Sequence, residues 1–98
     1  VSYQKSWRQR KLLDELELYR KEVDQVDDLI LKSLTERVKI CMAIGLLKKK
    51  RGMPVKDISR ENDVYKKVKE KSAKLCLDSE RVEAVYREIV NMCSAVQE

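Results

Sequence analysis

The chain has 98 residues, a length that suits one domain with a modest core, and a formal net charge of +5. It has no histidine, which excludes the common catalytic triads and most zinc sites, and its apolar runs are too short for a membrane span or a secretory signal. Its three cysteines lack C-x-x-C spacing and favour a reduced, cytoplasmic protein over a disulfide scaffold.

Most of the net charge lies at the start of the chain. Residues 1–11 contain four basic residues and no acidic one, whereas residues 12–98 contain 18 basic and 17 acidic residues. The nearly neutral body argues against a nucleic-acid-binding surface on the folded domain. We predict that residues 1–11 form a loosely ordered basic arm and that residues 12–98 form a single domain.

The sequence predicts an all-α fold with three helices. Two glycines, one proline and no phenylalanine leave few signals for turns or strands. The first helix is expected over residues 12–51, where nothing breaks the chain except Gly45, which costs only about 1 kcal/mol. Gly52 is well placed to end this helix as its C′ residue, after four basic residues that suit the negative end of the helix dipole.

Two shorter helices follow. The second is expected over about residues 59–75, with Asp57 or Ser59 as its N-cap, and Asp78 or Ser79 is expected to cap the third. Apolar residues at helical spacing mark the inner sides of both helices: Ile58, Tyr65, Val68 and Leu75 on the second, and Val82, Val85, Tyr86, Ile89, Val90, Cys93 and Val96 on the third.

The length of the first helix indicates a dimer. Forty helical residues form a rod of about 60 Å, whereas a compact domain of this size is only about 30–35 Å across. Two short helices of the same chain cannot cover such a rod. A second copy of the chain is the simplest way to bury its apolar stripe, so we expect a homodimer.

Charged residues interrupt that apolar stripe. At alternating spacings of four and three, the stripe contains Arg20, Asp27, Arg37 and Lys48 among apolar residues. Charges in such a seam are costly unless they are paired or bind a ligand, so the alternatives are salt bridges that set the helix register and a site for an anionic ligand. Arg20 and Arg37 lie about 25 Å apart along one helix, so they can approach one ligand only from antiparallel copies.

The segment "PVKDISRE", residues 54–61, combines helix capping with an unexplained cation. Asp57 can accept backbone N–H bonds, and Glu61 in the first turn suits the helix dipole. Arg60 is not explained by capping, because a cation is mildly unfavourable at a helix N-terminus.

One long stretch and seven spaced residues together resemble a known family. The stretch is "YRKEVDQVDDLILKSLTERVKICMAIGLLKKKRGMPVKDISRE", and the spaced residues are Arg20, Arg37, Lys48, Asp57, Arg60, Glu61 and Gln97. From about Leu16 to Gln97 the sequence is similar to the all-helical class of chorismate mutases. The resemblance implies an intertwined homodimer with two shared sites, which rearranges chorismate to prephenate in phenylalanine and tyrosine biosynthesis without a metal or cofactor.

The resemblance also implies a role for each of these residues. Arg37 and the partner subunit's Arg20 would clamp the substrate carboxylates, and Arg60 would add positive charge nearby. Lys48 and Gln97 would donate hydrogen bonds to the ether oxygen, on which negative charge grows during the reaction.

Two further contacts follow from the same resemblance. Glu61 and the backbone at Asp57 would hold the ring hydroxyl. Cys93 stands where some members of the family have a serine that helps to bind a carboxylate, and a thiol is a weaker donor. We expect Cys93 to line the site, with a small core residue as the alternative. No cysteine is needed by the reaction.

Three other functions remain open. An isochorismate pyruvate-lyase shares the fold and much of the cationic pocket that the resemblance implies. A non-catalytic helical dimerisation module would use the seam charges only to set register. A nucleic-acid-binding protein would use the basic arm and residues 48–51, and its affinity would fall steeply with salt.

Overall fold

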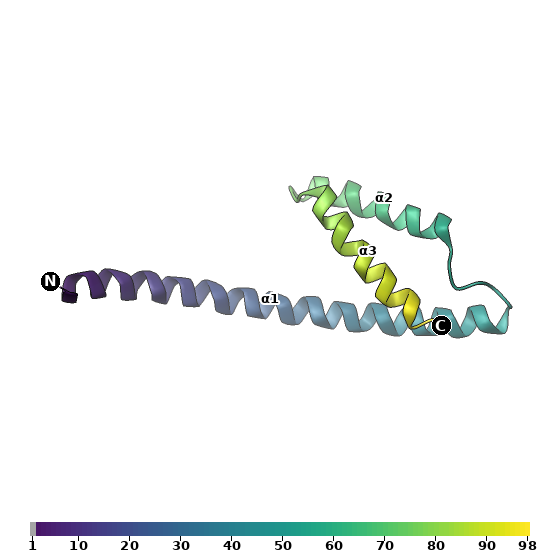
Figure 1. Ribbon diagram of the computed structural model, residues 1–98, viewed down its shortest axis with the longest axis horizontal. Coiled ribbons are helices and arrows are strands. Elements are labelled where there is room, and N and C mark those ends of the chain that lie inside the picture. Colours follow the sequence, from purple (N-terminus) through teal and green to yellow (C-terminus); the bar gives the residue numbers. More distant parts are fainter. Residues whose placement is uncertain (1) are drawn as a thin grey trace. The chain divides into compact units, whose positions relative to one another are not determined.

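The computed structural model describes the backbone of residues 2–98 and the side chains from Trp7 onward. Its three helices are α1 (Ser2–Lys50), α2 (Ile58–Lys74) and α3 (Ser79–Ala95), and the described residues contain no strand (Figure 1). The predicted all-α fold is therefore confirmed. The chain divides into two compact units, Val1–Ser33 and Leu34–Glu98. Within the described part of the chain, no helix combines the length and apolar character needed to cross a membrane.

The unit of residues Val1–Ser33 consists of the first part of α1. The helix begins at Ser2 rather than near Leu12, so residues 2–11 of the expected basic arm belong to α1; the loose ordering of the arm stays a prediction. Every side chain described in this unit is exposed. The exposed set includes large apolar residues: Trp7, Leu12, Leu16, Tyr19, Val23, Val26 and Ile30. Nothing in this unit of the single chain buries them.

α1 ends at a left-handed turn on Gly52, as the sequence predicts. Gly52 has a φ of 64°, a conformation that residues with a Cβ adopt at a cost. Its N–H donates to the carbonyl of Lys49 at 3.3 Å, and the N–H of Met53 donates to the carbonyl of Lys48 at 2.8 Å. Together these bonds form a Schellman motif, which closes the helix and leads into the connection to α2.

Aspartates begin both shorter helices. Asp57 is the N-cap of α2, and its Oδ1 accepts a hydrogen bond from the backbone N–H of Arg60 at 3.0 Å. Asp78 is the N-cap of α3, and its Oδ1 accepts from the N–H groups of Glu80 at 3.1 Å and Arg81 at 3.2 Å. Each carboxylate satisfies donors that the helix leaves without partners, so the cap predictions at Asp57 and Asp78 are confirmed.

The end of α2 repeats the Schellman motif with a cysteine in place of glycine. Cys76 has a φ of 60°, and its N–H donates to the carbonyl of Ala73 at 3.2 Å. The N–H of Leu77 donates to the carbonyl of Ser72 at 3.0 Å. Since a Cβ is unfavourable in the left-handed region, this turn keeps its shape at the expense of local strain.

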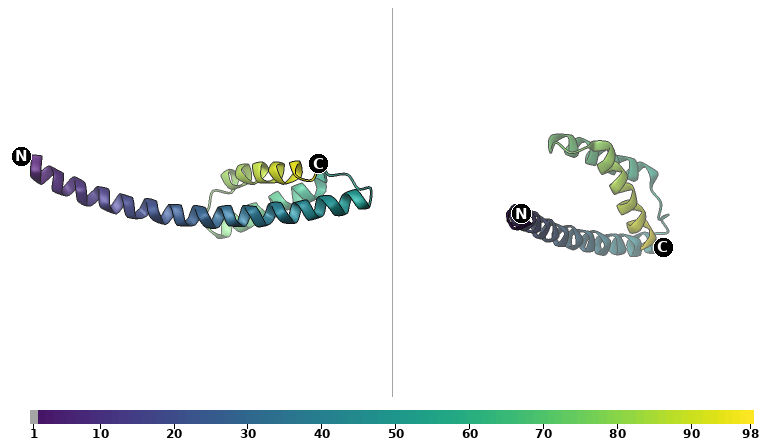
Figure 2. Two further views of the ribbon diagram at one scale, coloured as in Figure 1. Left: turned by 90° about the horizontal axis from the view of Figure 1, so that it is seen from below. Right: turned by 60° about the vertical axis from the view of Figure 1, so that its left-hand side comes forward.

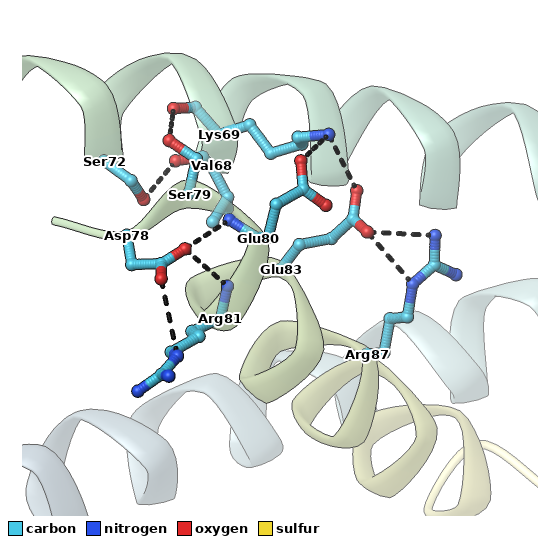
Figure 3. Close-up of polar contacts among 9 residues, drawn as sticks. All are labelled: Val68, Lys69, Ser72, Asp78, Ser79, Glu80, Arg81, Glu83 and Arg87. Atoms are coloured by element: carbon cyan, nitrogen blue, oxygen red, sulfur yellow. Dashed lines mark hydrogen bonds and ion pairs between the residues drawn. The ribbon is translucent and has the colours of Figure 1, made fainter.

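Ion pairs hold α2 and α3 together near the turn that joins them (Figure 3). The Nζ of Lys69 on α2 lies 3.0 Å from Glu80 and 3.6 Å from Glu83 on α3. Glu83 is also within 3.5 Å of the Nε of Arg87, whose guanidinium lies 4.3 Å from the ring centroid of Tyr65. The contacts therefore run from α2 to α3 and back to an aromatic ring on α2.

The core of the unit Leu34–Glu98 is small and takes residues from all three helices. Its buried side chains are Cys41 of α1, Tyr65 and Ser72 of α2, and Val90 and Cys93 of α3. The hydroxyl of Ser72 is satisfied by the carbonyl of Val68 at 2.6 Å. Beyond the end of α3, Gln97 lies against Gly45 of α1, and Figures 1 and 2 both show the C-terminus of the chain near the later part of α1.

Part of the predicted inner surface is exposed within this unit. The exposed fractions are 63% for Ile58, 70% for Leu75, 59% for Val85 and 40% for Val96, so the prediction that they face inward is wrong for a single chain. Ile58 opens α2, while Leu75 and Val96 are the C-caps of α2 and α3. At these helix ends no other part of the unit covers the side chain.

Candidate functional site

A pocket of about 200 Å³ lies between the three helices of the unit Leu34–Glu98. Seven of the eight site residues predicted from the sequence line it: Arg37, Lys48, Asp57, Arg60, Glu61, Cys93 and Gln97. Three of these are cations and two are carboxylates, so the lining has an excess of positive charge. Such a lining suits an anionic ligand.

Lys48 stands at the centre of the polar contacts in this pocket. Its Nζ donates to the backbone carbonyl of Val55 at 2.6 Å and to Oε1 of Gln97 at 2.9 Å. The lysine is partly buried, and these two bonds hold its ammonium against the wall of the pocket. One of its three donor positions remains for a ligand.

The contact with Lys48 determines how the amide of Gln97 is oriented. An ammonium group only donates, so it must face the amide oxygen rather than the amide nitrogen. The NH₂ group of Gln97 then points away from Lys48, and beside its hydrogen bond to the Cys41 thiol one of its two hydrogens remains for a ligand. The ammonium and the amide therefore place two hydrogen-bond donors at the same wall of the pocket.

Arg37 lies one turn before Cys41 on α1. Its Nη1 is 3.9 Å from Sγ of Cys41, and both side chains line the pocket. Burial raises the pKa of the Cys41 thiol, and the neighbouring Cys93 raises it further, whereas Arg37 and a hydrogen bond from Gln97 act in the opposite direction. The two thiols and the guanidinium thus form one cluster in the lining of the pocket.

The start of α2 supplies another part of the lining. Asp57 accepts two backbone bonds, one at its carboxylate from Arg60 and one at its carbonyl from Glu61 at 3.0 Å. The guanidinium of Arg60 lies 3.1 Å from Asp63, which also pairs with Lys67 at 3.1 Å. The hydrogen bond from Lys67, reinforced by Arg60, lowers the pKa of the Asp63 carboxyl. Capping thus accounts for Asp57, whereas Arg60 lines the pocket and makes a separate, largely exposed ion pair with Asp63.

Arg20 is the predicted site residue that does not line this pocket. It belongs to the unit Val1–Ser33, where its Nη1 lies 3.1 Å from Oε1 of Glu17. Both side chains are largely exposed, so the pair is a weak surface interaction that a stronger partner can replace.

The structure adds pocket residues that the sequence did not single out for the site. They are Cys41, Ile44, Val55, Val64, Val90 and Ser94. Cys41 and Ile44 were visible as seam positions, but nothing local to Ser94 or to the carbonyl of Val55 marks them. Gly45 was expected only to weaken the first helix slightly. In the structure it is buried and lies against Gln97. A glycine inside a long helix was the available signal.

Comparisons with known proteins show which family this chain is similar to. The family model described as chorismate mutase type II matches residues 19–98. The chain is 31% identical over 88 residues to a bifunctional chorismate mutase/prephenate dehydratase from Aquifex aeolicus, a match that covers 87% of this chain and 24% of that protein. It is 31% identical over 65 residues to a chorismate mutase from Methanocaldococcus jannaschii, covering 66% of this chain and 62% of the relative.

A solved structure shares the arrangement of helices. It belongs to a conserved hypothetical protein from Pyrococcus furiosus and superposes with a TM-score of 0.67 at 29% sequence identity. The match covers 85% of this chain and 95% of that one. The two curated relatives are longer proteins, of which this chain spans 24% and 62%.

Proposed function

Because the chain belongs to the chorismate mutase type II family, we propose that it converts chorismate into prephenate, a step of phenylalanine and tyrosine biosynthesis. The observation that carries the proposal is the pairing of Lys48 with Gln97 at the wall of a cationic pocket. The proposed setting is the cytoplasm, in keeping with the cysteine pattern.

The chemistry of this rearrangement suits the groups that line the pocket. The reaction is pericyclic and needs neither a nucleophile nor a proton transfer, so it makes no demand for histidine. The substrate is a flexible dianion that must fold before its C–O bond breaks. Negative charge then grows on the ether oxygen, where the ammonium of Lys48 and the NH₂ of Gln97 would both donate.

Carboxylate binding would fall to the arginines. A guanidinium matches a carboxylate in a planar, bidentate fashion, and Arg37 in the pocket lining is partly buried. Arg60 would add positive charge from the start of α2. Glu61 and the backbone at Asp57 would hold the ring hydroxyl, and Cys93 would line the carboxylate side of the pocket.

The last cation would come from a second copy of the chain. We propose a homodimer in which Arg20 of the partner subunit enters each site, which would raise the formal charge of the lining from +1 to +2 and match a dianion. The large apolar residues exposed along α1 support this assembly, because a soluble monomer rarely leaves such a stripe uncovered.

The direct test is an absorbance assay for loss of chorismate. Prephenate has the same mass as chorismate, so the product is identified by proton NMR. Lys48→Ala should abolish most of the activity, whereas Lys50→Ala, which changes an exposed lysine on the same helix, should leave it intact. Release of pyruvate from isochorismate, with no turnover of chorismate, would instead assign a lyase.

A further inference from the structure

A close backbone contact joins Gly45 of α1 to Gln97. A Cβ placed on Gly45 would lie 2.9 Å from Cα of Gln97 and 3.1 Å from both its Cβ and its Cγ. Real Cβ atoms essentially never come within 3.0 Å of another heavy atom, and the nearest atom here belongs to the backbone. Any residue other than glycine at position 45 would therefore push Gln97 away from α1.

Gln97 lies across three successive positions on one face of α1. Cys41, Gly45 and Lys48 follow each other at spacings of four and three, which places them in a line along the helix. Lys48 holds the amide oxygen at 2.9 Å, Gly45 contacts the atoms from Cα to Cγ, and Cys41 lines the pocket one turn earlier. The missing side chain at the middle position leaves the space that Gln97 occupies.

The backbone of Gln97 has little other support. It follows the last residue of α3, Ala95, and the C-cap Val96. Its N–H donates to the carbonyl of Ser94 at 3.1 Å, an i→i−3 bond of the kind that ends a helix. A single turn at a helix end is easily displaced, so the contact with Gly45 sets how closely Gln97 approaches α1.

We propose that Gly45 is a positioning residue for Gln97: without a Cβ at position 45, the backbone of Gln97 lies against α1, and its amide meets Lys48 at the pocket wall. A helix selected only for stability would have alanine there, because a glycine in a helix interior is less stable than an alanine. The geometric claim stands on the contact itself, and its catalytic consequence rests on the proposed function.

Gly45→Ala tests the proposal. Ordinary contact begins near 3.4 Å, so the added methyl would move Gln97 by about half an ångström or more. We expect kcat to fall about 10–100-fold with KM changed less than about threefold, because Gln97 acts on the transition state. Ala43→Ser, which adds one atom at an exposed position of the same helix, should leave both constants unchanged.

A double mutant separates positioning from a general loss of structure. In a Gln97→Ala background the amide is already gone, so adding Gly45→Ala should lower kcat by less than about threefold further. If Gly45→Ala lowers kcat by the same factor in the Gln97→Ala background as in the wild type, Gly45 acts through the fold of the pocket. That result would overturn the proposal.

A second readout does not depend on activity. The side-chain NH₂ of Gln97 can be assigned in a ¹H–¹⁵N spectrum by its disappearance in Gln97→Ala, and it should shift in Gly45→Ala but not in Ala43→Ser. An unshifted Gln97 signal in Gly45→Ala would overturn the proposal. If the wild type does not convert chorismate, the proposed function fails, while the shift still decides whether Gly45 positions Gln97.

Discussion

The Nζ of Lys48 lies 2.9 Å from Oε1 of Gln97, so a residue of the first helix orients an amide that follows the third. The pairing turns two separate polar groups into adjacent donors. Because neither donor needs to reorganise as charge develops on an acceptor between them, this arrangement suits stabilisation of an oxyanion-like transition state.

Replacement of Gln97 should therefore act on turnover. Gln97→Ala removes one donor and should lower kcat about 10²–10³-fold. Gln97→Glu preserves the shape, but an ionised carboxylate only accepts hydrogen bonds and would repel the growing charge, whereas its protonated form donates. We expect Gln97→Glu to be poor at neutral pH and to gain activity as the pH falls, which a pH–rate profile measures.

The matched control for that profile is Gln9→Glu, which makes the same change at an exposed position of α1 outside the pocket. It should follow the wild-type profile. A flat profile near wild-type activity for Gln97→Glu would remove Gln97 from the catalytic set.

A shared site can be detected by subunit exchange. Arg20→Ala and Arg37→Ala should each be inactive, because each removes one arginine from both sites of the dimer. After unfolding and refolding together, half of the dimers are mixed, and one of their two sites regains both arginines. Activity should then return to about a quarter of wild type. Confirmed exchange without recovery would place both arginines in a single chain.

The left-handed turn at Cys76 offers a way to stabilise the protein. Cys76→Gly removes the Cβ that is unfavourable at a φ of 60°, and we expect the unfolding free energy to rise by about 0.5–1 kcal/mol after allowance for the freer unfolded chain. Thermal melts at fixed protein concentration measure the change. Cys76→Ala keeps a Cβ and should not raise the unfolding free energy. An equal rise in Cys76→Ala would show that loss of the thiol, and not relief of the backbone, stabilises the protein.

Because the pKa of the Cys41 thiol is raised in the folded chain, the unfolding free energy should fall at alkaline pH. Burial keeps this thiol protonated in the folded chain, while the unfolded chain ionises it near its ordinary pKa of 9.0. This contribution to stability is therefore complete below pH 9.0 and is lost as the pH rises from there through the folded pKa.

Denaturant unfolding between pH 8 and pH 10 tests this linkage. Cys41→Ser should show a smaller alkaline loss than wild type, whereas Cys76→Ser, which removes an exposed thiol, should keep the wild-type slope. The ion-paired Lys69 does not confuse the comparison, because its pKa is raised from 10.5 and its contribution is lost only at higher pH. Identical slopes in all three proteins would contradict the assignment to Cys41.

Features set by neighbouring residues were predictable from the sequence, and features set by distant contacts were not. The caps Asp57 and Asp78 and the turn at Gly52 follow from local backbone chemistry. The exposure of Leu75 depends on what the rest of the molecule covers, which periodicity cannot report. The role of Gly45 depends on Gln97, far along the chain, and no local rule links the two.

Lys48 holds the connection between α1 and α2 at two points. Its carbonyl accepts the N–H of Met53 and its ammonium donates to the carbonyl of Val55, so backbone and side chain of one residue fix successive parts of the same loop. Surface loops usually tolerate insertions. Here an added residue would break one of these bonds or shift Asp57, and the whole start of α2 would move with it. The connection between α1 and α2 is thus a spacer of fixed length, and an inserted peptide should be tolerated less well there than in an ordinary surface loop.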